Sequence, residues 1–225
     1  MRFRLRSMIF LALLASGLAV RGQAMNDSAL FTIARLKYGG GGDWYASPSA
    51  LPNLLAFIGE HTDIAVAAQE ARVEIMDRAL FSYPFLWMTG HGNVSFTPEE
   101  AARLRHYLES GGFLHADDNY GMDESFRREM ARVFPDKELV ELPPDHGIFH
   151  CHFSFPNGLP KIHEHDGKPP QALGIFADER LIVLYTYETD LGNGWEDEQV
   201  HGNPPDVRRA ALEMGTNIVV WALTH

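Results

Sequence analysis

FLWMTGHGN, residues 85–93, decides the fold together with two segments that follow it, TPEE at 97–100 and GGFLHADD at 111–118. In this order the three segments predict a strand, a loop, a helix and a second strand. The first apolar run is short enough for a buried parallel strand and ends at a histidine between glycines, whereas the second ends at two adjacent carboxylates. Because ligands of open α/β sheets bind beyond the carboxyl ends of the strands, this unit predicts both an α/β fold and the place of a site.

The remaining sequence predicts further strands and helices within a single domain over residues 25–225. Phe31 to Tyr38 alternates with period two and predicts a strand that a flexible turn, Gly39 to Gly42, ends. Thr97, Pro98 and Glu100 have the pattern of a helix N-cap with a capping box. The other expected strands are 64–68 and a hairpin of 174–176 with 181–187, and the other expected helices are 49–60, 123–133 and 206–223, while 72–80 stays unassigned.

Residues 1–24 have the pattern of a signal peptide. Arg2, Arg4 and Arg6 precede the apolar run Met8 to Val20, which is shorter than the ~20 residues needed to span a bilayer. Cleavage after Ala24 is therefore favoured over a membrane anchor. No later segment is apolar enough for stable membrane insertion, so we expect a periplasmic or secreted protein.

The net charge bears on binding partners, and the cysteine content bears on disulfide bonds and on a thiolate nucleophile. Loss of the leader, which holds four Arg and no acid, changes the net charge from −11 to −15, and this acidity argues against nucleic acid as a partner. A single cysteine, Cys151, excludes an internal disulfide. Its flanking histidines suggest a thiolate nucleophile, but neighbours on a strand point away from it, so a small buried side chain is the favoured role.

Several segments of the chain form a set that goes beyond general α/β patterning: Gly40-Gly41-Gly42-Asp43-Trp44-Tyr45, Tyr83-Pro84-Phe85, Thr89-Gly90-His91-Gly92, Gly111-Gly112-Phe113-Leu114, Asp117-Asp118, Phe134-Pro135, Asp145-His146, Asp190-Leu191-Gly192-Asn193-Gly194-Trp195 and Gly215-Thr216-Asn217. With them, the chain from Tyr38 to its end resembles the domain-of-unknown-function family numbered 4159. That family is similar in fold to flavodoxin-like proteins and class I glutamine amidotransferases. The resemblance implies a mixed, mostly parallel sheet with helices on both faces, and it implies no reaction.

Amidotransferases of this fold use a Cys nucleophile on a sharp turn from strand to helix. The corresponding turn here, His115-Ala116-Asp117-Asp118, has no Cys, so amide transfer by that mechanism is not expected. Some exported proteins with this fold, including the trehalose-utilisation type, also lack the nucleophile and are suspected of acting on sugars or binding them. This likeness is one of fold alone.

His91, Asp117 and Asp118 are the candidate catalytic residues. His91 follows a buried strand and lies between two glycines, which suits a general base or a metal ligand, with the shaping of a turn as the alternative role. Asp117 and Asp118 point to opposite sides if the strand continues through them. We therefore expect one of them to face the crevice and the other to cap the following helix or to bind loop amides.

A metal site is a second hypothesis. In an extended chain His146, His150 and His152 share one face, and with His91 and Asp117 they could bind Zn²⁺, Mn²⁺ or Fe²⁺. The alternative is that these are ordinary loop histidines, beside a polar segment, His163-Glu164-His165-Asp166, that we expect to be a solvated loop.

Ligand binding is expected from two glycine-rich loops. Trp44 and Trp195 each lie beside an acid and suit stacking on the apolar face of a sugar ring, with Asp43 and Asp190 available to hydroxyl groups. The alternative is that each tryptophan packs its loop against the core. The sequence thus favours an exported, metal-assisted hydrolase of a saccharide or amide at the crevice, with a non-catalytic domain that binds a glycan, a peptide or a partner protein as the alternative.

Overall fold

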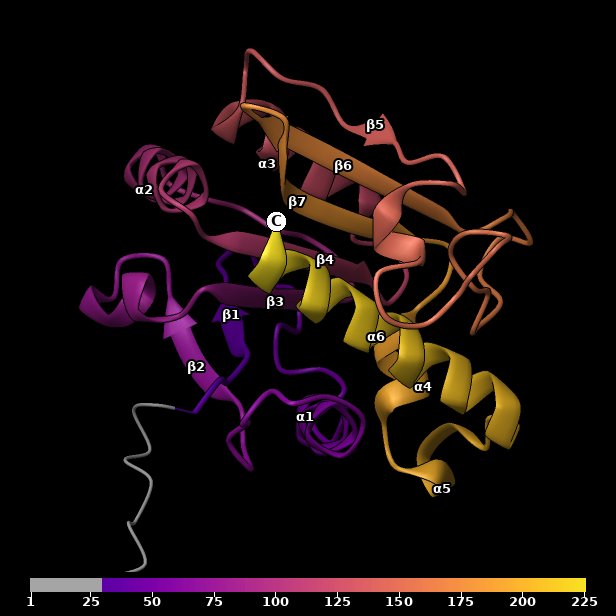
Figure 1. Cartoon of the computed structure of the whole chain (residues 1–225). Helices are drawn as coiled ribbons and strands as arrows, with labels where there is room; N and C mark the ends of the chain where they lie inside the picture. The colour runs from indigo at the N-terminus through magenta and orange to yellow at the C-terminus, as the bar shows by residue number, and fades with distance from the viewer. Residues whose placement is uncertain (1–29) are drawn as a thin grey trace, which may run out of the picture.

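The computed structural model describes residues 30–225, which are built around one seven-stranded sheet in the order β2-β1-β3-β4-β7-β6-β5 (Figure 1). The expected leader at residues 1–24 lies outside the described residues. The strands are Ala34–Lys37 (β1), Ala71–Glu74 (β2), Phe85–Gly90 (β3), Phe113–Asp118 (β4), Val140–Glu141 (β5), Gln171–Ala177 (β6) and Arg180–Tyr187 (β7). The first four strands and β7 pair in parallel, whereas β6 is antiparallel to both β5 and β7. The expected mixed, mostly parallel sheet is confirmed.

Helices cover both faces of this sheet. They are Ala50–His61 (α1), Pro98–Glu109 (α2), Asp123–Val133 (α3), Leu191–Trp195 (α4), Glu198–His201 (α5) and Pro205–Thr224 (α6), with short 3-10 turns at Arg78–Ser82 and Gly147–Phe149. Figure 1 shows α1 and α6 on the side of the sheet toward the viewer and α3 behind β6. Among the described residues, no helix is long and apolar enough to cross a membrane.

The alternation of side chains along β3 explains the two layers of helices. Leu86 and Met88 belong to an apolar core with α2 and α3, whereas Phe85 and Trp87 belong to a second core with α1, α4 and α6. All four side chains are almost fully buried, and burial of such a side chain stabilises the fold by about 1.5–3 kcal/mol. A strand that is apolar on both faces is thus held at the centre of the sheet.

Helix α2 begins where its sequence predicts. The Thr97 hydroxyl accepts a hydrogen bond from the backbone N–H of Glu100, and the Glu100 carboxylate accepts one from the backbone N–H of Thr97. This reciprocal pair satisfies two N–H groups that a helix N-terminus otherwise leaves without partners. It sets the end of the loop between β3 and α2, which begins at His91.

The second strand lies later in the sequence than expected. Residues 64–68 contribute only an isolated bridge, Val66 with Phe31, whereas β2 forms at Ala71–Glu74 beside β1. Of the four β2 side chains only Val73 is buried, because β2 is an edge strand. An edge strand does not need a continuous apolar run such as the one at residues 64–68, from which the strand was predicted.

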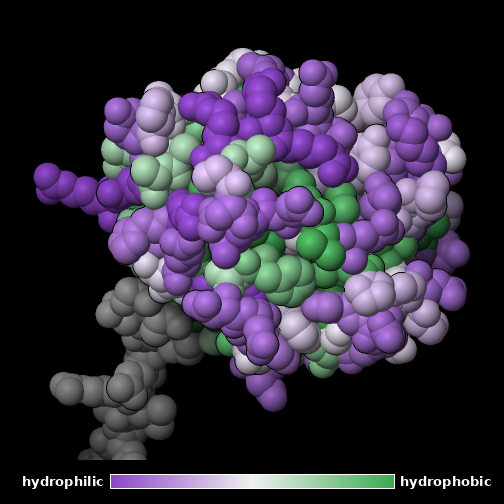
Figure 2. All heavy atoms as spheres, turned by 90° about the horizontal axis from the view of Figure 1, so that it is seen from above, coloured by the Kyte–Doolittle hydropathy of each residue, from purple (hydrophilic) through white to green (hydrophobic). Residues whose placement is uncertain are grey.

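The face seen from above, on the β5 side of the sheet, carries a band of apolar residues bordered by hydrophilic ones (Figure 2).

Candidate functional site

The order of the parallel strands locates a topological switch point between β1 and β3. The chain leaving β1 enters α1 on one face of the sheet, and the chain leaving β3 enters α2 on the other face. In doubly wound sheets of the order found here, β2-β1-β3-β4-β7, ligands bind where two such connections diverge. We call the two loops at this place, residues 39–43 and 90–93, the switch-point edge.

Glycines allow the two loops of the switch-point edge to touch. The backbone N–H of Gly42 donates to the Asn93 carbonyl at 3.0 Å, and the Asn93 side-chain amide donates to the Gly40 carbonyl at 3.0 Å. Gly40 has φ of +105°, and a Cβ atom there would lie 2.7 Å from the backbone nitrogen of Ser95. Only glycine satisfies both the backbone conformation and the close approach.

Asp43 and His91 form a hydrogen-bonded pair across the two loops. One Asp43 oxygen accepts the backbone N–H of His91, and the other lies 2.9 Å from Nδ1 of the His91 ring. Burial acts to raise the pKa of Asp43, but the hydrogen bonds from His91 outweigh it and the pKa falls below its ordinary value. The ionised carboxylate therefore requires the proton on Nδ1, which leaves Nε2 of the neutral ring as an acceptor. The His91 side chain is 56% exposed, so the ring is accessible from solvent.

Asp117 and Asp118 point to opposite sides of the sheet, as expected from strand alternation, and both are buried. Asp117 accepts hydrogen bonds from the Thr186 hydroxyl at 2.6 Å and from the backbone N–H groups of Leu191 and Gly192 at the start of α4. Burial and the charge of Asp190 raise the pKa of Asp117 to about 7, against the effect of these hydrogen bonds.

The Asp118 side chain points to the other face of the sheet. One of its oxygens accepts the backbone N–H groups of Tyr120 and Met122, which lie just before α3. Burial raises the pKa of Asp118 against the effect of these two hydrogen bonds. Asp118 thus binds loop amides, one of the two roles expected for one carboxylate of the pair, and it does not cap α3, whose N-cap residue Met122 has no side-chain cap hydrogen bond. Asp117 anchors the turn that leads into α4.

The two tryptophans have different environments. Trp195 is 1% exposed, donates its ring N–H to the Ala211 carbonyl at 2.7 Å and packs beside Trp87. Its ring therefore packs in the core, the alternative role considered for it. Trp44 is partly buried at the switch-point edge, and its ring meets that of Tyr45 edge to face at 5.6 Å.

His146 and His150 do not join His91 and Asp117. His146 caps a short 3-10 turn, and its ring packs on Trp221 and Phe176. Phe176 pairs with Leu181 near the start of β7, whereas Asp117 bonds Thr186 near the end of the same strand. The ring of His150 bonds the Pro144 carbonyl. The metal-ligand set expected from the sequence is therefore not assembled.

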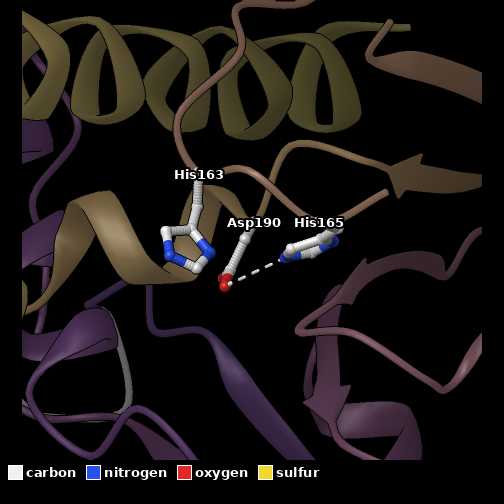
Figure 3. Close-up of side chains that lie close together, drawn as sticks. All are labelled: His163, His165 and Asp190. Atoms are coloured by element: carbon white, nitrogen blue, oxygen red, sulfur yellow. Dashed lines mark ion pairs between the residues drawn. The ribbon is translucent and has the colours of Figure 1, made fainter. Parts of the chain in front are cut away.

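A different set of potential ligands converges beyond the ends of β4 and β7. His163, His165 and Asp190 each offer a ligand atom, and these atoms lie within 4.8 Å of one another. Figure 3 shows the two histidines on either side of Asp190. The segment that holds the histidines, expected to be a solvated loop, is held to the loop after β7 by a hydrogen bond from the His163 backbone N–H to the Thr189 carbonyl. In the sequence, this cluster was indicated only by two histidines that are separated by one residue.

Comparison with known proteins gives one family. The family model described as "Domain of unknown function (DUF4159)" matches residues 32–223, which is nearly all of the described chain. A search of curated proteins found no match.

Proposed function

The chain belongs to this family of unknown function, DUF4159, and because membership supplies no reaction, we propose from the geometry that the switch-point edge is the catalytic site of a hydrolase. In this proposal His91 is the general base, Asp43 is its positioning residue and the substrate is a saccharide or an amide. The observation that carries the proposal is the hydrogen bond between Asp43 and Nδ1 of His91, which leaves Nε2 free. A base held by a carboxylate and open to solvent is the arrangement that acid–base catalysis requires.

The chemistry follows from the two ring nitrogens. Nε2 of His91 removes a proton from a water molecule, and for an amide the water oxygen bonds to the carbonyl carbon. The bond from that carbon to the leaving nitrogen then breaks, and the imidazolium returns its proton to that nitrogen. For a sugar, the bond from the anomeric carbon to the leaving oxygen breaks as the water oxygen bonds from the opposite face, so the leaving oxygen takes its proton from solvent. Asp43 stabilises the imidazolium at Nδ1 throughout. A positioned acid–base group of this kind accelerates a reaction by about 10²–10⁴-fold.

The rigidity of the two loops supports this role. The hydrogen bonds between residues 39–43 and 90–93 fix the distance between Asp43 and His91 before any substrate binds. A base held in place costs no reorganisation during the reaction, so its full effect appears in the rate.

The test is hydrolysis of a panel of chromogenic nitrophenyl glycosides, esters and anilides. We expect His91→Gln to lower kcat/KM for any active substrate by at least about 100-fold, and Asp43→Asn to lower it by a similar factor because the ring loses its fixed tautomer. His106→Gln, a change of an exposed histidine in α2, is the matched control and should leave the rate unchanged. All four proteins should melt at similar temperatures. Equal rates in the wild type and His91→Gln would refute the proposal.

A second candidate function is non-catalytic binding of a glycan, peptide or partner protein. It is favoured by two aromatic side chains near this edge of the sheet: Tyr45 is 63% exposed and Tyr120 is 52% exposed. Exposed aromatic rings of this kind stack on sugars and anchor peptides. Saturable binding of a glycan without turnover, weakened by Tyr45→Ala and unaffected by His91→Gln, would favour this second function. The leader pattern of residues 1–24 supports, for both functions, a ligand or partner outside the cytoplasm.

A further inference from the structure

The buried ring of His165 has two nitrogen atoms that lack hydrogen-bond partners in the described part of the chain. Its side chain is 3% exposed, and neither ring nitrogen has a hydrogen-bond partner within residues 30–225. Leaving a buried polar atom unsatisfied costs about 1–3 kcal/mol. At least one ring nitrogen is a lone-pair donor in the neutral ring, so a ligand that accepts a lone pair would remove this cost.

The nearest charged group to His165 is a carboxylate that is already held in place. Nε2 of His165 lies 3.7 Å from Oδ2 of Asp190, too far for a hydrogen bond (Figure 3). The other Asp190 oxygen accepts the backbone N–H of Asn193 at the start of α4. Asp190 also has φ of +55°, a left-handed conformation that costs a residue other than glycine about 1–3 kcal/mol. One carboxylate oxygen is thus fixed by the helix, and the other points to the histidines.

We propose that His163, His165 and Asp190 form a binding site for one divalent transition metal ion, Zn²⁺, Mn²⁺ or Fe²⁺. This inference goes beyond the proposed hydrolase, because it concerns different residues and neither claim requires the other.

The distances fit this proposal. A metal bound at about 2.0–2.2 Å by nitrogen and oxygen keeps tetrahedral ligand atoms about 3.4 Å apart. The separation of 3.7 Å between His165 and Asp190 is close to this value, and all three ligand atoms lie within 4.8 Å of one another. His163 is exposed, so neighbouring side chains leave its ring room to adjust when a metal binds.

The ligand types select the class of metal. Two imidazoles and one carboxylate favour Zn²⁺, Fe²⁺ and Mn²⁺ over Ca²⁺ or Mg²⁺, which prefer oxygen ligands. Three protein ligands leave at least one coordination position for water, as in catalytic rather than structural zinc sites. A neighbouring carboxylate, Glu188, is already occupied by the Lys161 ammonium group at 3.0 Å and by the backbone N–H of Asp166, so Asp190 is the carboxylate that remains for the metal.

Negative charge around His165 supports a bound cation, and it also defines the rival explanation. Burial acts to lower the pKa of His165, but the carboxylates of Asp190, Asp118 and Glu188 raise it above its ordinary value. In the rival explanation the cation is a proton, and His165 is an imidazolium paired with Asp190. The two explanations differ in whether His163 matters and in whether added metal changes the ring.

The experiment is metal titration of the full protein after treatment with chelator, with Zn²⁺, Mn²⁺ and Fe²⁺ measured by calorimetry and Co²⁺ followed by its visible absorption. The variants are His163→Ala, which changes an exposed ring, and Asp190→Asn, which keeps an oxygen to cap α4. His150→Ala is the matched control, because it removes a histidine that bonds the Pro144 carbonyl away from this site.

We expect close to one metal ion per wild-type chain, with Kd raised at least about tenfold by His163→Ala and by Asp190→Asn, and unchanged by His150→Ala. If one of the two variants fails to fold, the other still decides. No uptake by the wild type, or equal uptake by all four proteins, would overturn the proposal. So would ¹⁵N spectra in which His165 is an imidazolium that metal does not perturb. Because the readout is binding without substrate, failure of the hydrolase proposal leaves this result unaffected.

Discussion

Acid should destabilise this protein through one histidine, His115 in β4. The His115 side chain is 1% exposed, and its Nε2 lies 3.0 Å from the Thr186 hydroxyl oxygen. That hydroxyl donates to Asp117, so it accepts from His115, whose ring is neutral with the proton on Nε2. Burial lowers the pKa of His115 from 6.5 to about 3.

The sign and size of the effect follow from linkage. The unfolded chain takes up a proton at His115 as the pH falls below 6.5, while the folded chain does not until the pH nears about 3. Stability is therefore complete above pH 6.5 and is lost as the pH falls through this window. Each pH unit inside the window costs about 1.4 kcal/mol, and the whole window of about 3.5 units costs about 5 kcal/mol.

The assay is urea unfolding followed by tryptophan fluorescence at pH 7, 6, 5 and 4, for the wild type and His115→Gln. The variant should lose about 1.4 kcal/mol less per pH unit than the wild type. Asp117, whose raised pKa acts in the opposite sense, is present in both proteins, so the difference isolates His115. His106→Gln, an exposed control, should follow the wild type. Parallel curves for the wild type and His115→Gln would refute the reasoning.

Three further predictions concern the scaffold. Both Gly40 and Gly41 have positive φ, but a Cβ would meet backbone atoms only at Gly40, so Gly40→Ala should lower the free energy of unfolding by at least about 1 kcal/mol more than Gly41→Ala in urea titrations; equal losses would contradict the close approach. Arg35, 1% exposed, bonds the Glu70 carboxylate at 2.8 Å, so Arg35→Met should cost about 3–5 kcal/mol in the same assay, and a loss below about 1 kcal/mol would contradict the buried pair. Thr97→Ala removes one arm of the capping box and should lower the unfolding free energy by about 1 kcal/mol, whereas no change would show that the cap is dispensable.

Local sequence signals predicted the central part of the fold. The run 85–90, the capping box at Thr97 and the second run 113–118 each carry their own pattern, and all three formed where expected. The strand β2 was missed because its position is set by pairing with β1 rather than by its own apolar pattern. Helix α4 likewise depends on a distant contact, because the backbone N–H of its first residue, Leu191, bonds Asp117, which lies 74 residues earlier in the chain.

The candidate site was predictable in part for the same reason. His91 was identified because it ends a buried strand, but its partnership with Asp43 depends on the contact between two loops 48 residues apart. The sequence predicted only a polar loop for His163 and His165, because the contact of that loop with Thr189, after β7, is what brings them to Asp190. Patterns along the chain thus predict where polar groups emerge from the sheet, and contacts between distant loops decide which of them meet.

The most direct test of the account is the tautomer of His91, measured by long-range ¹H–¹⁵N correlation spectra of the wild type and Asp43→Asn at a pH where the ring is neutral. A general base held by Asp43 requires the proton on Nδ1 and a free Nε2 in the wild type, and a shift toward the other tautomer in Asp43→Asn. A wild-type ring with its proton on Nε2, or tautomer populations that Asp43→Asn leaves unchanged, would contradict the central claim that His91 is the base of a catalytic site.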